Sequence, residues 1–140
     1  MNGLGFDTDN LYETRLLREQ RQKEDLLVSK LASTIKPAKE EPKTYAMDAD
    51  GVLIYHESEW PPEKIGPPLK PGIEIAKRIK AAGHKLVILT AKPKSCHAKL
   101  KAALAKEGVQ VDDITNTKPP AELYIDDRAI RWPRNYRGKK

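Results

Sequence analysis

From residue 44 onward, short apolar runs alternate with helical segments along the chain. The apolar runs lie in residues 44–48, 84–90, 109–117 and 122–126, and the helical segments in residues 70–83 and 94–108. This alternation is the sequence form of parallel βαβ units, in which each helix connects two neighbouring strands. It predicts an α/β fold, a three-layer Rossmann-like domain with a central parallel sheet.

The two helical segments carry signals at their ends. Pro71 lies near the start of the first, and Gly83 and Gly108 follow the two segments where a helix C-cap favours glycine. The strand between them contains the continuous apolar run Leu86 to Leu89, as expected for a strand buried on both faces. Two crossover helices are therefore predicted between the strands.

The N-terminal third of the chain has a different pattern. Residues 10–35 are rich in helix formers. Apolar residues at mostly helical spacing are Tyr12, Leu16, Leu27, Leu31 and Ile35. We predict a helical extension over residues 1–36, a linker over 37–43 and the α/β domain over 44–140. The helix would dock or self-associate, which makes a homo-oligomer an expectation; a partly disordered arm is the alternative.

The charge is distributed unevenly. Residues 1–43 contain eight basic and eight acidic residues, so the net charge of +6 belongs to residues 44–140. The last stretch, residues 128–140, has six basic residues and no acidic one. A basic domain attracts anions such as phosphorylated metabolites or nucleic acid, although ordinary solubility produces similar charge.

The composition also limits location and metal chemistry. No apolar run approaches the roughly 20 residues that span a bilayer, and the N-terminus has no signal-peptide pattern. A cytoplasmic location without membrane association is the expectation. Cys96 is the single cysteine, so no internal disulfide forms, and no Cys/His spacing suggests zinc.

Polar residues lie where the predicted strands end. Asp48 and Asp50 follow the first strand, Thr90 the second, and Asp126 and Asp127 the fourth. Ligands bind at this edge of open α/β sheets. Lys118 lies nearby in sequence. Grouped carboxylates repel one another, and a hard cation stabilises them; Mg²⁺ fits best because it takes one or two carboxylates plus waters and phosphate oxygens.

The spacing of Asp48 and Asp50 has a chemical meaning. Residues i and i+2 of an extended segment point to the same side, so both carboxylates can reach one substrate. Gly51 then permits a turn that would strain other residues. One aspartate can attack phosphorus, and the other can act as general acid and then as general base toward water.

Four segments carry a family resemblance. "MDADGVLI", "KLVILT", "TKPP" and "LYIDDRA" occur in this order between residues 47 and 129. They resemble the four motifs of the haloacid dehalogenase superfamily of phosphohydrolases, in particular its small phage and bacterial members.

The resemblance implies a role for each matching residue. Asp48 would be the nucleophile, and Asp50 the general acid/base with its backbone carbonyl on the metal. Thr90 would bind phosphoryl oxygens, and Lys118 would pair with the phosphate and the nucleophile. Asp126 and Asp127 would hold Mg²⁺ together with Asp48 and Asp50.

Residues 56–70, "HESEWPPEKIGPPLK", form a segment with four prolines that we call the flap. It is too short for the cap domain found in many superfamily members, so an open site is expected, with the N-terminal helix as a partial cover or dimer contact. Asp112 and Asp113 are interpreted as surface charge and Trp60 as a packing or lid residue. His56, His84 and His97 receive no chemical role.

Three functions remain open beside hydrolysis of a phosphorylated small molecule or nucleotide. The "IDDR" segment is also similar to the 3′-phosphatase modules of polynucleotide kinases, which would make a nucleic-acid end the substrate. Transfer to an alcohol instead of water would make the protein a phosphotransferase. A non-catalytic interaction protein on the same scaffold is the third alternative.

Overall fold

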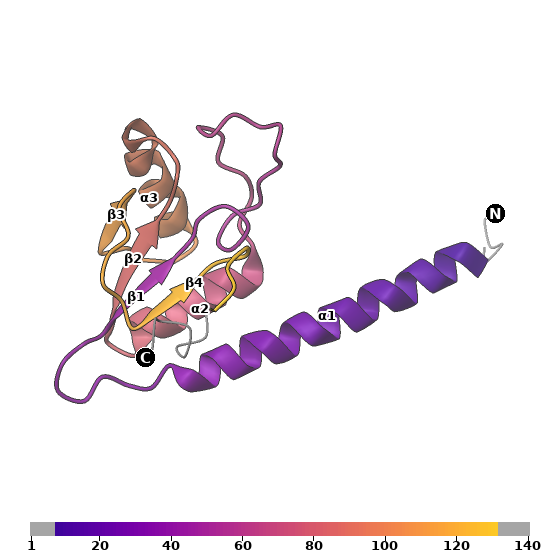
Figure 1. The fold of residues 1–140 in the computed structure, drawn as a ribbon, viewed down its shortest axis with the longest axis horizontal. Helices are drawn as coiled ribbons and strands as arrows, with labels where there is room; N and C mark the ends of the chain where they lie inside the picture. The colour runs from indigo at the N-terminus through magenta and orange to yellow at the C-terminus, as the bar shows by residue number, and fades with distance from the viewer. Residues whose placement is uncertain (1–7, 132–140) are drawn as a thin grey trace, which may run out of the picture. The chain divides into compact units, whose positions relative to one another are not determined.

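The structure is a computed structural model, and it describes residues 8–131, with side chains from residue 14 onward. The chain divides into two compact units, residues 1–36 and 37–140. The first unit contains helix α1 (Thr8–Thr34), drawn in indigo and purple in Figure 1. The helix predicted from residue 10 is confirmed. Four of its leucines are exposed, at positions 16, 17, 26 and 27.

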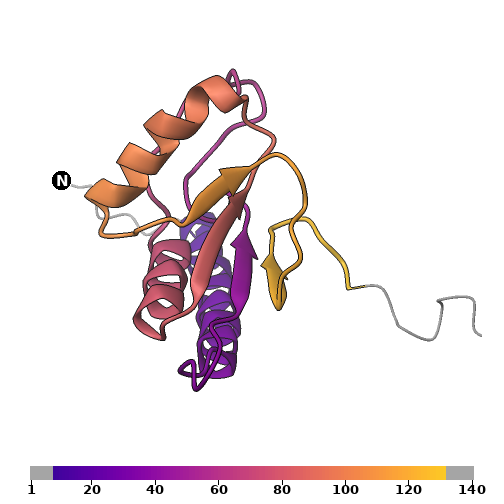
Figure 2. The same cartoon turned by 90° about the vertical axis from the view of Figure 1, so that its left-hand side faces the viewer.

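The second unit is an α/β domain. Its elements are β1 (Thr44–Met47), α2 (Lys70–Ala81), β2 (Lys85–Leu89), a 3-10 turn η1 (Lys94–Cys96), α3 (His97–Lys106), β3 (Asp113–Thr115) and β4 (Leu123–Ile125). The four strands are parallel and lie in the order β3-β2-β1-β4, which can be followed in Figure 2. This parallel sheet flanked by helices confirms the predicted α/β class and is consistent with the Rossmann-like three-layer fold.

The strand order reverses at β1. From β1 the chain passes through α2 to β2 and through α3 to β3, and it then returns to the other side of β1 to form β4. The chain therefore diverges from β1 in two directions, toward β2 and β3 on one side and toward β4 on the other. This divergence is the topological switch point at which open α/β sheets bind ligands.

The core lies between the two central strands and the helices that follow them. Met47 of β1 and Leu86 and Ile88 of β2 are fully buried, as the continuous apolar runs of these strands predict. Ile79 of α2 and Leu100 of α3 are buried as well. Apolar burial on this scale stabilises the sheet by about 1.5–3 kcal/mol per large side chain, and it fixes the positions of the strand ends.

The segment predicted as a linker is attached to the domain. The backbone N–H of Ala38 donates to the carbonyl of Ala82 at 2.8 Å, and the N–H of Lys43 donates to Nδ1 of His84 at 3.0 Å. Both partners lie in the turn between α2 and β2, where Gly83 has φ +87°. Residues 37–43 therefore belong to the second unit in the structure.

Asp112 does more than carry surface charge. Its carboxylate accepts hydrogen bonds from Nζ of Lys80 at 2.6 Å and from the backbone N–H of Leu86 at 2.7 Å. Although partial burial raises its pKa, the bond from Leu86 and the ammonium of Lys80 hold the pKa of Asp112 below its ordinary value. Asp112 thus joins the C-terminal part of α2 to the start of β2.

Two further expectations concern the outside of the molecule. Across residues 8–131, no helix has both the length and the apolar character needed to cross a bilayer. The predicted basic tail falls largely on residues 132–140, which lie outside the described part of the chain.

Candidate active site

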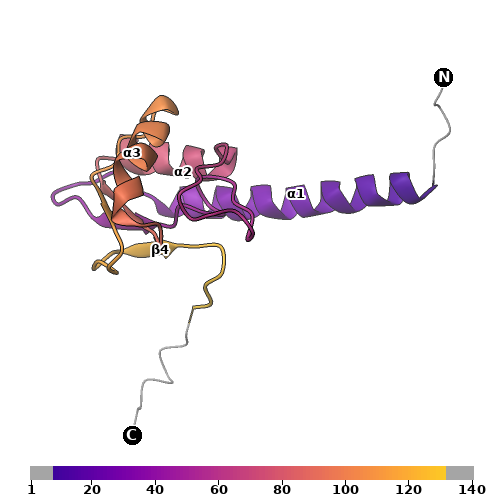
Figure 3. The same ribbon diagram turned by 90° about the horizontal axis from the view of Figure 1, so that it is seen from above.

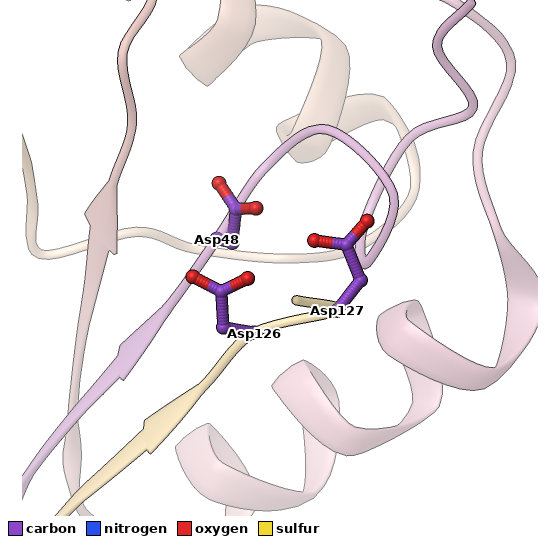
Figure 4. A group of neighbouring side chains, drawn as sticks. All are labelled: Asp48, Asp126 and Asp127. Carbon is purple, nitrogen blue, oxygen red and sulfur yellow. The ribbon is translucent and has the colours of Figure 1, made fainter. Parts of the chain in front are cut away.

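Three carboxylates meet at the switch point of the sheet (Figure 4). Asp48 directly follows β1, and its backbone N–H donates to the carbonyl of Ile125 at 2.9 Å, which continues the pairing of β1 with β4. Asp126 and Asp127 directly follow β4. One carboxylate oxygen from each aspartate lies within 4.8 Å of the other two. The parallel register of β1 and β4 therefore brings together residues that are far apart in sequence.

The three carboxylates fit a magnesium ion. Mg²⁺ prefers oxygen ligands at about 2.0–2.1 Å in octahedral geometry, so ligands on opposite sides of the ion are about 4.1 Å apart. The oxygens of Asp48, Asp126 and Asp127 lie within 4.8 Å of one another, so side-chain movement toward a common centre would bring all three into contact with one ion. Asp126 and Asp127 are exposed, which leaves positions for water and a substrate oxygen.

The charges of the three carboxylates also favour a bound cation. Burial and the neighbouring charge of Asp126 raise the pKa of Asp48 to about 6. The charges of Asp127 and Asp50 add to this effect, while the hydrogen bond from the backbone N–H of Ala49 opposes it. The negative charges at the strand ends thus repel one another, and a bound cation would offset this repulsion.

Gly51 allows the turn after β1 to pass close to Asp127. Its φ of +86° lies in the left-handed region, which glycine adopts without strain. A Cβ at this position would collide with the carboxylate of Asp127. The glycine of the "DADG" segment is therefore needed for both its backbone conformation and its small size.

Asp50 is not one of the three grouped carboxylates and lies beside two other side chains, those of Lys92 and His56. Its Oδ1 lies 3.2 Å from Nζ of Lys92, and its Oδ2 lies 3.8 Å from Nδ1 of His56. These are ion-pair approaches rather than aligned hydrogen bonds: within residues 14–131, neither Asp50 Oδ1 nor His56 Nδ1, both buried, has a hydrogen-bond partner. The carboxylate of Asp50 is therefore held by charge, with 29% of its side chain exposed.

Thr90 is buried in the turn that follows β2. Its Oγ1 accepts a hydrogen bond from the backbone N–H of Lys92 at 3.1 Å. The side-chain amide of Asn116 donates to the carbonyls of Thr90 and Lys92 at 2.7 and 2.8 Å, and Nε2 of His97 lies 3.1 Å from the carbonyl of Lys92. The side chains of Thr90, Asn116 and His97 thus hold this turn in place. It lies beside the end of β1, because β1 and β2 are neighbours in the sheet.

Lys118 lies elsewhere. Its Nζ is 4.4 Å from the centre of the Tyr124 ring, and among the described residues it forms no ion pair with a carboxylate. The hydroxyl of Tyr124 in turn donates to the carbonyl of Pro119. Lys118 is exposed and lies in the connection between β3 and β4, so this structure does not place it against Asp48. Its predicted contact with the nucleophile stays a prediction.

Sequence reasoning missed Lys92, His56 and Asn116. Lys92 offered one signal: it follows Thr90 by two residues in "TAKP", so an extended turn would direct both side chains to the same side. His56 and Asn116 offered none, because their partners lie in loops without a periodic pattern. Arg128 directly follows the second acidic pair, and its Nε lies 3.9 Å from Oδ1 of Asp127.

A hollow of about 560 Å³ lies beside the flap, between residues such as Lys64 and Ile65 and the side chains of Lys99 and Ala103 on α3. None of the four aspartates at the strand ends lines it. The hollow is thus separate from the carboxylate group.

Comparison with known proteins supports the fold. A solved structure of a conserved protein from Bacteroides thetaiotaomicron is similar to this chain with a TM-score of 0.54 and 20% sequence identity. The match covers 64% of this chain and 79% of that protein. No family model matches the sequence, and no curated protein matches it. At this level of identity, the likeness shows a shared α/β fold.

Proposed function

We propose that the protein is a magnesium-dependent phosphomonoesterase of the haloacid dehalogenase type. The observation that carries this proposal is the convergence of Asp48, Asp126 and Asp127 within 4.8 Å at the switch point of a parallel sheet. The four motif-like segments support it, since they follow the strands in the order that this superfamily shows. Binding of a phosphate ester at the carboxyl ends of the strands is also where the fold favours ligands.

In the proposed reaction, Asp48 attacks the phosphorus of the ester. A bond forms between a carboxylate oxygen of Asp48 and phosphorus, and the bond from phosphorus to the alcohol oxygen breaks. Asp50 gives its proton to the leaving oxygen. Asp50 then takes a proton from water, and this water attacks the phosphorus of the aspartyl-phosphate. Inorganic phosphate leaves, and Asp48 and Asp50 return to their starting states.

The acidic group would hold the cation that this chemistry needs. Asp48, Asp126 and Asp127 would bind it through side-chain oxygens, and Asp50 through its backbone carbonyl. When bound, Mg²⁺ would supply positive charge that draws the phosphate oxygens to the site and offsets charge as the phosphoryl group is transferred. Thr90 and Lys118 would bind phosphoryl oxygens once substrate is present.

Hydrolysis of p-nitrophenyl phosphate by the full chain, with Mg²⁺ and with EDTA, tests the proposal. We expect activity with Mg²⁺, loss of that activity in EDTA, and a fall of about 10³-fold or more in Asp48→Asn, because the nucleophile is removed. Glu74→Gln is the matched control: Glu74 is an exposed acid on α2 that forms no hydrogen bond or ion pair with the site among the described residues, and the same acid-to-amide change should leave the rate unchanged.

Two outcomes would contradict the proposal. Hydrolysis that survives Asp48→Asn undiminished would exclude Asp48 as the nucleophile. A folded protein that hydrolyses neither aryl phosphates nor any phosphorylated metabolite would instead favour the alternative of a non-catalytic interaction protein. A transferred phosphoryl group found on an added alcohol would identify a phosphotransferase.

The substrate class is proposed to be a phosphorylated small molecule or nucleotide. The net charge of +6 outside residues 1–43 and the exposure of Asp126 and Asp127 also suit the phosphorylated end of a nucleic acid. Dephosphorylation of a 3′-phosphorylated oligonucleotide distinguishes the two. A rate that falls steeply with salt would indicate that basic side chains hold the phosphate backbone, whereas a small ester should show a weak dependence.

A further inference from the structure

We propose that Lys92 is a positioning residue that couples the flap, residues 56–70, to the carboxylate of Asp50. The inference about Asp50 rests on the proposed function, because it concerns the residue that would move the proton. The mechanical part, that Lys92 holds the flap, rests on the contacts alone.

Lys92 is the one charged side chain among the fully buried residues of the described chain, with 1% of its side chain exposed. A buried ammonium is costly unless oxygens replace its water shell. Here Nζ donates to the carbonyls of Pro62 and Lys64 at 2.5 and 2.9 Å and lies 3.2 Å from Oδ1 of Asp50. Three oxygens thus surround a group that has three N–H donors.

Two of these oxygens belong to the flap, and the third belongs to the proposed acid/base. The flap is closed at its base by hydrogen bonds from Tyr55 to Pro67 and from Leu69 to Leu53, at 2.8 and 2.9 Å. Figure 3 shows from above the loop that joins β1 to α2. Farther along the flap, the bonds from Lys92 attach Pro62 and Lys64 to the turn after β2.

The side chains of the flap pack against one another. The two hydrogen bonds from Lys92 to the carbonyls of Pro62 and Lys64 should therefore position the whole segment. The ring of Trp60 packs against Tyr55 and His56 at centroid distances of 5.5 and 5.8 Å, and Nζ of Lys64 lies 3.8 Å from its centre. A Cβ on Gly66 would collide with the carbonyl of Tyr55. His56, at the start of the flap, also faces Asp50.

The other end of the coupling is rigid. The backbone of Lys92 is fixed by Thr90, Asn116 and His97, so its side chain extends from an anchored turn. A change in the flap is therefore transmitted to Asp50 through the Lys92 ammonium, because this group bonds two flap carbonyls and is also paired by charge with Asp50. Loss of that ammonium should release the flap and leave Asp50 without its closest positive charge.

Hydrogen exchange of the full chain tests the mechanical part. The backbone amides of Trp60 and Lys64, bonded to the carbonyls of Glu57 and Pro61, report on the flap. In Lys92→Met we expect their exchange to be about tenfold faster or more, because two charge-assisted hydrogen bonds are lost, while amides of β1 and β2 keep their protection. Lys94→Met, which changes an exposed lysine two residues away, should alter neither set.

Asp50→Asn provides a second variant and a test of the coupling. If Lys92 links Asp50 to the flap, removing the charge of Asp50 should also speed exchange at Trp60 and Lys64, although residue 50 lies outside the flap. The exchange of the flap amides in Asp50→Asn also tests the coupling if Lys92→Met does not fold. Unchanged flap exchange in Asp50→Asn and in a folded Lys92→Met would overturn the proposal.

The leaving group tests the chemical part. An alkyl phosphate needs a proton from the general acid, whereas p-nitrophenolate leaves without one. If Lys92 positions Asp50, Lys92→Met should reduce kcat for an alkyl phosphate at least about tenfold more than kcat for p-nitrophenyl phosphate, and this difference should disappear in an Asp50→Asn background. Equal losses for both esters would indicate a purely structural role and overturn the positioning of Asp50.

The two proposals fail in different ways. If the unmodified protein hydrolyses no phosphate ester, the proposed function is wrong, and the exchange measurements still decide whether Lys92 holds the flap. If hydrolysis is found but flap exchange does not respond to Lys92→Met, the proposed function stands and the coupling is wrong.

Discussion

At the scale of single residues, the turn after β1 shows how closely backbone and side-chain requirements are combined. Gly51 has a positive φ and also leaves the space that the carboxylate of Asp127 occupies. Gly83 has nearly the same φ, +87°, but a Cβ there would meet only Ala38 at an ordinary distance of 3.6 Å. A comparison of substitutions at Gly51 and at Gly83 can therefore distinguish the effect of backbone strain from the effect of displacing the carboxylate of Asp127.

Gly51→Ala and Gly83→Ala should therefore differ in metal binding. Both substitutions force alanine into a left-handed conformation, which costs about 1–2 kcal/mol, so both should lower the free energy of unfolding. Only Gly51→Ala should also weaken Mg²⁺ binding, because it displaces Asp127. Thermal unfolding and a calorimetric Mg²⁺ titration measure the two effects. Equal Mg²⁺ affinity in both variants would show that Asp127 does not hold the ion.

The raised pKa of Asp48 predicts that the carboxylate group destabilises the metal-free fold. A carboxyl whose pKa is about 6 in the folded chain, against 3.8 ordinarily, binds its proton more tightly when folded. Stability is therefore lost as the pH rises from about 4 through 6 and Asp48 ionises. In EDTA at pH 8, Asp48→Asn should raise Tm by about 3 °C or more, and at pH 4 the two proteins should unfold alike.

The control for this prediction is Glu74→Gln, which removes an exposed charge on α2 and should leave Tm unchanged at both pH values. A metal-free Asp48→Asn protein that unfolds at the wild-type temperature at pH 8 would show that the carboxylates do not repel one another as their distances indicate.

At the scale of elements, the contacts of Asp112 join α2 to β2 at the end of the sheet opposite the site. The carboxylate receives both the ammonium of Lys80 and the backbone N–H of Leu86. Asparagine can still accept the bond from Leu86, so Asp112→Asn removes the charge and keeps the shape. The side chain of Asp112 is 40% exposed, and solvent therefore screens the ion pair.

Asp112→Asn should lower the free energy of unfolding by about 1 kcal/mol at pH 7. Because the folded chain lowers the pKa of Asp112 below 3.8, this contribution is present above pH 3.8 and is lost as the pH falls through the lower, folded value. Urea unfolding of both proteins between pH 7 and pH 2.5 measures it. Asp113→Asn is the control, because within the described residues the carboxylate of Asp113 accepts only the neighbouring backbone N–H of Ile114.

The elements themselves were predictable because their patterns are periodic. The strands β1, β2, β3 and β4 lie within the apolar runs identified from the sequence, and α2 lies within its predicted segment. The segment 94–108 differs, since it begins with η1 before α3. Its first turn follows Pro93, whose φ of −58° and ψ of 151° are extended, so the regular helix starts only at His97.

At the scale of the whole molecule, α1 carries four of the large apolar side chains that are exposed within the described residues. Its leucines at 16, 17, 26 and 27 are between 46% and 68% exposed. We expect the full chain to self-associate through α1, because pairing two such helices removes these side chains from water. Light scattering after size exclusion should give a mass above the 15.8 kDa of one chain.

Replacing Leu16 and Leu27 by glutamine should return the mass to that of one chain without lowering the Tm of the α/β domain. The matched control replaces two exposed polar residues of the same helix, Gln20 and Gln22, by serine and should leave the association unchanged. A full-length protein that is a monomer at high concentration would contradict this expectation.

The site divides into a part that follows from the fold and a part that does not. Asp48 and Asp126 come together because parallel strands end at one edge of a sheet, so their positions followed from predicting β1 and β4. The partners of Asp50 were not predicted, because His56 reaches it from the flap and Lys92 reaches it from the turn after β2. No repeating pattern determines the path of such a loop, which depends on tertiary contacts like those of Trp60.

The position of β4 at the end of the strand series has a consequence for the newly made protein. Asp126 leaves the ribosome 78 residues after Asp48, which at 5–20 residues per second is roughly 4–16 s later. Until then β1 has an unpaired edge on that side, and Asp48 lacks the two acids that would share a cation with it. During synthesis, the nascent domain would therefore pass through a stage with its first three strands paired but without the acidic group that would hold the proposed cation.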